Sequence, residues 1–155
     1  MPPSSPQEVE ILLPLLVSLG TILVTIVIHA IALVGVVSFV RRQYFLGRAG
    51  TGFWRDLAIV IAATQLALIA HVIEVTIWAA VLDLCDEFTH FAVAFYHSAM
   101  NYTSLGYGDI VMSPSWRLLG PLEAANGLLM FGISTAMIFA VIQRLVQPRF
   151  EDRHE

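Results

Sequence analysis

The sequence is poor in charge and in cysteine, and it contains no lysine. Charged residues make up only 13% of its 155 positions, whereas hydrophobic residues make up 57% and the mean hydropathy is +0.77. A soluble domain of this size cannot bury so much apolar side chain, so the composition indicates an integral membrane protein. The single cysteine, Cys85, excludes a disulfide framework within the chain and a cysteine-based metal site, and it leaves open a bond between two copies.

Several classes of function find no support in the sequence. The eight basic residues are all arginine and form no basic patch of the kind that binds nucleic acid, so no nucleic-acid partner is expected. There is no nucleophile with a base at a suitable spacing and no metal-ligand cluster, so neither an enzyme nor a resident cofactor is expected. No apolar run carries arginine at every third position, which excludes a voltage sensor of that type.

Three long apolar runs are instead present, at Ile11–Val40, Leu57–Leu82 and Leu122–Val146. The first run alone would form a helix of roughly 45 Å, compared with a hydrocarbon core of roughly 30 Å. Three membrane-spanning helices are therefore predicted. The segment Phe88–Tyr102 is too short and too polar to cross the membrane, and it predicts a re-entrant helix that enters and leaves on one side.

The arginines predict the orientation, because short cytoplasmic loops are enriched in basic residues. Four lie in a predicted polar connector, Arg41–Asp56, and three follow or close the third run, whereas the opposite side has only Arg117. This distribution predicts an inner-membrane protein with its N-terminus outside and its C-terminus in the cytoplasm. The outer side would then attract cations through the carboxylates of Glu8, Glu10, Asp83, Asp86, Glu87 and Asp109.

The segment Ser104-Leu-Gly-Tyr-Gly-Asp109 lies between the re-entrant helix and the third run. Its glycines, Gly106 and Gly108, can take positive φ at little cost, so that backbone carbonyls can be turned toward one axis and replace the water around a cation. Non-helical backbone at membrane depth is tolerated only when it is buried in protein or lines an aqueous path. Several copies are therefore expected to surround this segment.

The residues Thr103-Ser-Leu-Gly-Tyr-Gly-Asp109 resemble the TTVGYGD segment of potassium channels. The longer stretch AFYHSAMNYTSLGYGD, which begins at Ala94, looks like the pore helix and selectivity filter of bacterial members, and Gly132-Ile-Ser-Thr resembles their inner-helix hinge. The resemblance covers about residues 57–146. It implies that the second run is the outer helix, that the third is the inner, pore-lining helix, and that the first is an addition to the two-helix pore.

The resemblance also implies the site and the partners. It predicts a homotetramer among membrane lipids, with K⁺ as the permeant ion and no cofactor. The filter would comprise Thr103, Ser104, Leu105, Gly106, Tyr107, Gly108 and Asp109, and K⁺ would bind along Ser104, Leu105, Gly106 and Tyr107.

Three residues near this segment depart from the family pattern. Ser104 stands where threonine is usual and lacks the methyl group that helps to fix the side-chain rotamer. Leu105 replaces valine or isoleucine, which changes the packing behind the filter more than its ligands. Met100 stands where some members have an acidic partner for the filter aspartate, so Asp109 needs another hydrogen-bond donor or remains solvated.

Support for the filter is predicted from Tyr96, His97 and Met100. Tyr96 and His97 could brace Tyr107 as an aromatic cuff, or they could be ordinary interfacial aromatics. Gating hinges are predicted at Gly127 and Gly132. At Gly127, bending of the helix and close approach of another helix are equally consistent with the sequence, whereas the resemblance favours a hinge at Gly132.

Two histidines and two glutamates interrupt the apolar runs. His71 and Glu74 share one helical face and form either a proton-sensitive couple or a structural pair that docks their helix against its neighbours. His29 predicts a hydrogen bond between helices. Glu123 predicts a helix cap or a partner of Arg117.

The sequence therefore predicts an all-α membrane protein with three transmembrane helices, a re-entrant pore helix and a filter loop. Residues 1–56 would hold the first helix and the connector, residues 57–148 the pore domain, and residues 149–155 a short cytoplasmic tail. The predicted function is passive, selective permeation of K⁺. A weakly selective cation channel and a non-conducting accessory subunit are the alternatives.

Overall fold

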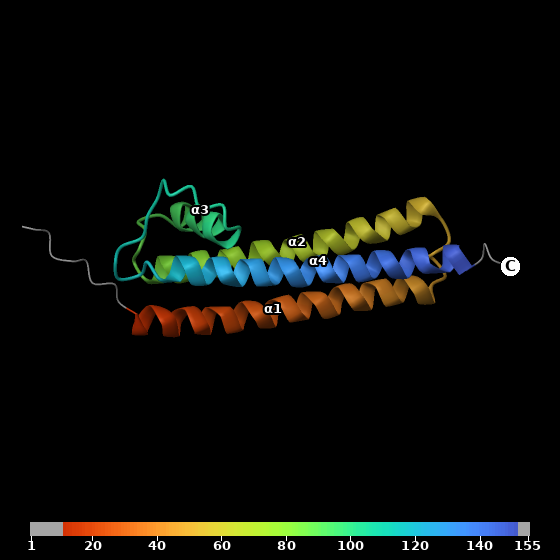
Figure 1. Cartoon of the computed structure of the whole chain (residues 1–155), viewed down its shortest axis with the longest axis horizontal. Coiled ribbons are helices and arrows are strands. Elements are labelled where there is room, and N and C mark those ends of the chain that lie inside the picture. Colours follow the sequence, from red (N-terminus) through yellow and green to blue (C-terminus); the bar gives the residue numbers. More distant parts are fainter. Residues whose placement is uncertain (1–10, 152–155) are drawn as a thin grey trace, which may run out of the picture. The chain divides into compact units, whose positions relative to one another are not determined.

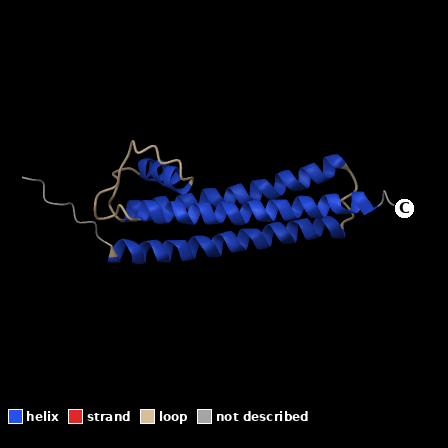
Figure 2. Ribbon diagram, in the orientation of Figure 1, coloured by secondary structure: helices blue, strands red, loops and turns tan. Residues whose placement is uncertain are grey.

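The computed structural model describes residues 11–151, which form four helices and, within this range, no strand (Figure 1; Figure 2). The helices are α1 (Leu12–Phe45), α2 (Phe53–Leu84), α3 (Phe91–Tyr102) and α4 (Leu119–Glu151). Three of them, α1, α2 and the Leu119–Val146 part of α4, are long and apolar enough to cross a membrane. The fold is all-α, and these helices indicate a multi-pass membrane protein. Glu8, Glu10 and the tail from residue 152 onward lie outside the described residues.

The connector between α1 and α2 is shorter than the sequence predicts. The prediction of a loop over residues 41–56 is wrong at both ends, because α1 continues beyond Arg42 and α2 begins before Arg55. The physical reason is that an arginine has a long apolar stem, so its charge can reach water while its backbone stays helical. Only residues 46–52 connect the two helices.

Two helices end in the same hydrogen-bonded cap. At the end of α1, the amide of Arg48 donates to the carbonyl of Gln43 at 3.0 Å, and the amide of Gly47 donates to the carbonyl of Tyr44 at 2.9 Å. Gly47 has φ +62°, the left-handed conformation that this cap requires. Asp86 takes the equivalent place after α2 with φ 53°, since aspartate tolerates this conformation better than most residues. Both helices therefore end at defined points.

The chain divides into two compact units. Unit 1 contains residues 73–129 together with α1 up to Ile26, and therefore includes α3 and the loop that follows it. Unit 2 contains residues 27–72 together with α4 from Met130 onward.

The core of unit 2 is formed by three helices. Its most buried apolar side chains come in pairs from α1, α2 and α4, namely Val36 and Val40, Ile59 and Ala63, and Val141 and Leu145. A hydrogen bond adds to this packing, because the hydroxyl of Tyr44 in α1 donates to the carbonyl of Arg144 in α4 at 2.5 Å. The first helix is thus fixed to α4 within this unit.

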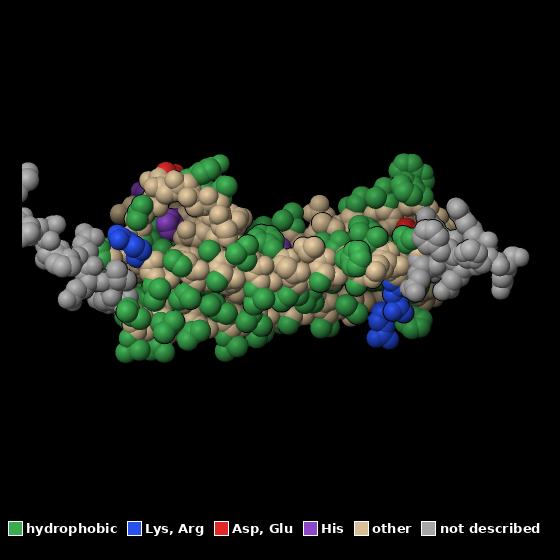
Figure 3. Space-filling view, in the orientation of Figure 1, with side chains coloured by type: hydrophobic (Ala, Val, Ile, Leu, Met, Phe, Trp, Pro, Cys, Tyr) green, Lys and Arg blue, Asp and Glu red, His purple; other side chains and the backbone are tan. Residues whose placement is uncertain are grey.

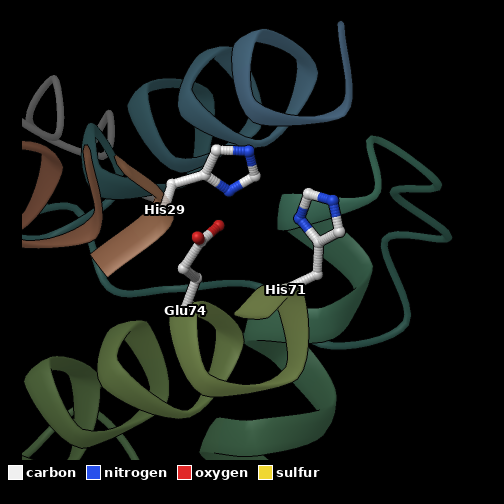
Figure 4. Close-up of side chains that lie close together, drawn as sticks. All are labelled: His29, His71 and Glu74. Atoms are coloured by element: carbon white, nitrogen blue, oxygen red, sulfur yellow. The ribbon is translucent and has the colours of Figure 1, made fainter. Parts of the chain in front are cut away.

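Two histidines of unit 2 meet at one serine. Nε2 of His71 lies 3.1 Å and Nε2 of His29 lies 3.2 Å from Oγ of Ser134, which belongs to α4. Because the serine hydroxyl has one proton, it donates to one imidazole and accepts a hydrogen bond from the other. Figure 4 shows the two imidazoles, whose ring centroids are 5.2 Å apart, with Glu74, which follows His71 by three residues on α2. The predicted helix–helix hydrogen bond of His29 is confirmed, and it joins α1 to α4.

Candidate functional site

The short helix α3 leads directly into Thr103–Asp109, called the filter-like segment from here on. With 12 residues, α3 is only about 18 Å long and cannot cross a membrane. It begins at Phe91, three residues after the predicted start, because His90 has the extended conformation of a residue that precedes a helix. The re-entrant helix that the sequence predicts is therefore present, slightly shortened.

Buried polar side chains attach α3 to its neighbours in unit 1. Oγ of Ser98 donates to the carbonyl of Val75 in α2 at 3.0 Å and also contacts the carboxyl group of Glu123 in α4. Ser98 and Glu123 are both fully buried. The prediction that Glu123 caps its helix or pairs with Arg117 is therefore wrong. Glu123 lies beyond the first turn of α4, at a position that faces α3, so the carboxyl group is directed inward.

A second carboxylate holds the end of α3. The hydroxyl of Tyr102, the last residue of α3, donates to the carboxylate of Glu74 in α2, and both side chains are fully buried. Of the two alternatives for Glu74, docking of the second apolar helix against the pore helix is the one that this contact supports. Tyr102 could not be predicted as the partner, since the two residues are 28 positions apart in the sequence.

The carboxyl end of α3 also touches the backbone of α4. A Cβ atom added to Gly127 would lie 1.9 Å from the carbonyl oxygen of Tyr102. No side chain fits in that space, so the reason for glycine at position 127 is close approach between helices. At Gly132 an added Cβ would meet no atom within 4 Å, which leaves the predicted hinge at that position as an expectation.

The filter-like segment has an alternating backbone. Ser104, Gly106 and Gly108 have φ values of 58°, 52° and 72°, whereas Leu105 and Tyr107 between them lie outside the positive-φ region. The glycines adopt this conformation readily, but for serine it is uncommon and costs free energy. The sequence predicted the freedom of the two glycines and missed Ser104.

The amides of this segment turn back toward α3. Ser104 donates to the carbonyl of Asn101 at 2.8 Å, and Leu105 and Gly106 both donate to the carbonyl of Met100, at 3.0 Å and 3.2 Å. All peptide bonds of the described chain are trans, so each carbonyl points opposite to the amide of the same peptide unit. The carbonyl oxygens of residues 103–105 therefore point away from the end of α3. This is the role of Met100 in the structure: it anchors the segment through its backbone.

The segment is open to solvent in the single chain. All residues from 103 to 109 are exposed, including the large side chains of Leu105 (54%) and Tyr107 (70%). Both side chains are therefore available to contact a neighbouring molecule.

The Asp109 end of the segment is held by a hydrogen bond from α3. The hydroxyl of Tyr96 donates to Oδ2 of Asp109 at 2.9 Å, and this hydrogen bond is the main reason that the pKa of Tyr96 is raised above its usual value. Tyr96 lies one helical turn before Met100, so it supplies the donor that the methionine cannot. The sequence predicted Tyr96 as a support but assigned it to Tyr107, whereas the hydrogen bond goes to the aspartate.

His97 supports the returning loop. Its ring is buried, it forms a hydrogen bond with the backbone of Ile110, and its centroid lies 5.0 Å from that of Phe88. Burial lowers the pKa of His97 below its usual value, against the opposing influence of Glu87 and Asp109. The imidazole is therefore predominantly neutral at neutral pH.

A further contact braces the same loop. The carboxylate of Glu87, which precedes α3, accepts hydrogen bonds from both the backbone amide and the hydroxyl of Ser113, the latter at 2.8 Å. Glu87 was predicted only as one of the acidic residues of the outer side, so this role was missed. The sequence does contain a signal for this contact, because a carboxylate lies shortly before the predicted short helix and a serine lies in the loop after it.

The site thus consists of three parts. They are the short helix α3, a loop whose backbone carbonyls point away from the end of α3, and a returning chain that side-chain hydrogen bonds hold in place. Residues 70–144 match the family model for ion channels. The match supports an ion channel of the pore-loop type, and it runs from the second half of α2 through α3 and the filter-like segment into α4. The match does not cover α1, so the prediction that α1 is an addition to a two-helix pore stays a prediction. No curated protein and no solved structure matches the chain.

Proposed function

We propose that this pore-loop protein is a potassium-selective channel in which four copies surround one pore. Each copy would contribute its filter-like segment, and K⁺ would pass along the backbone oxygens of residues 104–107. The Ser104 hydroxyl would add a ligand at the inner end. The resemblance of TSLGYGD to the potassium-channel filter favours K⁺ over other cations.

The observation that carries the proposal is the direction of the peptide groups. The amides of Ser104, Leu105 and Gly106 are occupied by carbonyls at the end of α3, so successive carbonyl oxygens face away from the chain that bears them. A row of carbonyls without amide partners binds a cation and repels an anion. One copy offers one such row, and a ring of copies would enclose the ion.

Electrostatics supports the same function. The carboxyl end of a helix carries a partial negative charge, and α3 ends at Tyr102, immediately before the filter-like segment. Asp109 adds a carboxylate at the other end of that segment. A cation is therefore favoured along the whole segment.

Assembly would also account for the exposed side chains. Leu105 and Tyr107 are more than half exposed in the single chain, and neighbouring copies would cover them. We further propose the inner membrane as the location, with the N-terminus outside and the filter-like segment opening outward. The arginines of the connector would then face the cytoplasm.

The proposal is tested by K⁺ flux into liposomes that contain the purified full-length protein. We expect flux that barium blocks, and loss of flux in Gly106→Ala, because alanine at φ +52° is strained. Gly35→Ala is the matched control, since an added Cβ there meets no atom within 4 Å. Flux that persists in Gly106→Ala would contradict the role of the filter-like segment, whereas absence of flux from correctly assembled wild-type protein would favour the accessory-subunit alternative.

A further inference from the structure

A groove lies between the carboxyl ends of the described parts of α1 and α4 in unit 2. It has a volume of about 650 Å³, and its walls include Val37 and Val40 from α1 and Met137 and Val141 from α4. This volume is within the range of roughly 300–1,000 Å³ that is usual for small-molecule sites. The groove lies on spans long enough to cross the membrane, so its apolar walls face the depth that lipid tails occupy.

Two arginines line the same groove. Arg41 belongs to α1 and Arg144 to α4, and both side chains are exposed. Among the described side chains, those of residues 11–146, neither arginine forms an ion pair with a carboxylate. Figure 3 shows basic side chains near this end of α1, with hydrophobic side chains beside them. The groove therefore combines apolar walls with two positive charges that an external anion can neutralise.

The position of one arginine is fixed by its neighbour. The guanidinium carbon of Arg144 lies 5.6 Å from the ring centroid of Tyr44, and the Tyr44 hydroxyl is bonded to the Arg144 carbonyl. A cation held over an aromatic face keeps its N–H groups free to bind at its edges. Arg144 is thus oriented in the absence of any ligand.

We propose that this groove binds an anionic phospholipid, with its phosphate between Arg41 and Arg144 and an acyl chain along the apolar walls. Basic pockets between transmembrane helices are typical sites for anionic headgroups. Charge favours this occupant over a second copy of the chain, which would have to present a negative group here. Among the described side chains, Asp56 has the only carboxylate near this end of unit 2. It is buried and accepts a hydrogen bond from the amide of Gly50.

The bound lipid would join α1 to α4 beside the Tyr44–Arg144 hydrogen bond, since both of these residues line the groove. Since α4 is the pore-lining helix in the proposed channel, the headgroup would change how firmly α4 is held. This goes beyond ion permeation and does not depend on which ion the pore selects.

Lipid binding is measured on the full-length protein in detergent by native mass spectrometry, with phosphatidylglycerol and phosphatidylcholine as probes. We expect retention of phosphatidylglycerol over phosphatidylcholine and about thirty-fold weaker binding in R41Q/R144Q, because each arginine near the surface contributes roughly a factor of five. Arg42→Gln is the matched control, since Arg42 is exposed one residue away and does not line the groove. Its affinity should equal that of the wild type.

A second variant tests the cavity itself. Ala140→Phe places a large side chain in the groove and should reduce phosphatidylglycerol binding, whereas Ile142→Phe, at an exposed position outside the lining, should not. Equal retention of both lipids, or unchanged binding in R41Q/R144Q, would overturn the proposal. It would also be overturned if Ala140→Phe dissociated the oligomer without affecting lipid binding, because a second copy would then occupy the groove.

Discussion

Gly127 of α4 lies against the carbonyl oxygen of Tyr102, the residue at which α3 ends, so closely that a Cβ atom would come within 1.9 Å of it. The obstacle is backbone, which cannot rotate away as a flexible side chain can. The backbone of α4 therefore fixes where α3 ends and where the filter-like segment begins.

Gly127→Ala is expected to displace α3 and to destabilise the protein by at least about 1–3 kcal/mol, the usual cost of overpacking. K⁺ flux should be lost as well, because the filter-like segment follows directly on the displaced end of α3 and would move with it. Thermal unfolding in detergent followed by circular dichroism measures the first effect. Gly132→Ala, which adds a methyl group in open space, should unfold like the wild type, and equal unfolding temperatures for all three proteins would contradict the packing role of Gly127.

Ser98→Ala should lower the free energy of unfolding by about 1–3 kcal/mol, the cost of leaving a buried polar group unsatisfied. The substitution removes the hydroxyl that lies between Val75 and Glu123. Glu123→Gln retains a hydrogen-bonding group at the same place and should cost less. Chemical denaturation of both variants provides the comparison, with the exposed Thr64→Ala as the control. A Ser98→Ala protein as stable as that control would rule out the bridging role.

Tyr96→Phe and Asp109→Asn should impair the filter in the same way. Each removes or weakens the hydrogen bond between Tyr96 and Asp109, so the double variant should be no worse than the more severe single variant. Single-channel recording would show the effect as shorter openings. Additive effects of the two substitutions would mean that the residues act independently.

The neutral state of His97 predicts sensitivity to acid. Burial holds the pKa of His97 in the folded protein below its usual 6.5, so the folded state binds fewer protons than the unfolded state in the window just below that pH. Stability should therefore fall as the pH drops through this window. Melting temperatures between pH 8 and pH 5 should decrease less in His97→Gln than in the wild type, whereas the exposed His90→Gln should behave like the wild type. If the melting temperature depended on pH in the same way in all three proteins, His97 would not be the source of the acid sensitivity.

Much of this fold could be predicted from the sequence, because membrane spans follow from composition alone. The three apolar runs each became a helix, and Phe88–Tyr102 became α3 with a later start. The ends were less predictable. Arg41 and Arg42 indicated a loop by their charge, but a helix ends where its backbone is capped, and the cap lies at Gly47.

The partners of buried polar groups could not be predicted. Glu123 and Ser98 are 25 positions apart, and only the folded chain brings them together. The left-handed conformation of Ser104 could not be predicted for a different reason, which is that serine has no preference for this conformation. The glycine pattern at 106 and 108 indicated the rest of the alternation.

Selectivity for K⁺ is tested by the reversal potential of current through the reconstituted protein. With mostly K⁺ on one side of the bilayer and mostly Na⁺ at the same total concentration on the other, we expect a reversal potential close to the K⁺ equilibrium potential. A reversal potential near zero, which means equal permeability for the two ions, would contradict it.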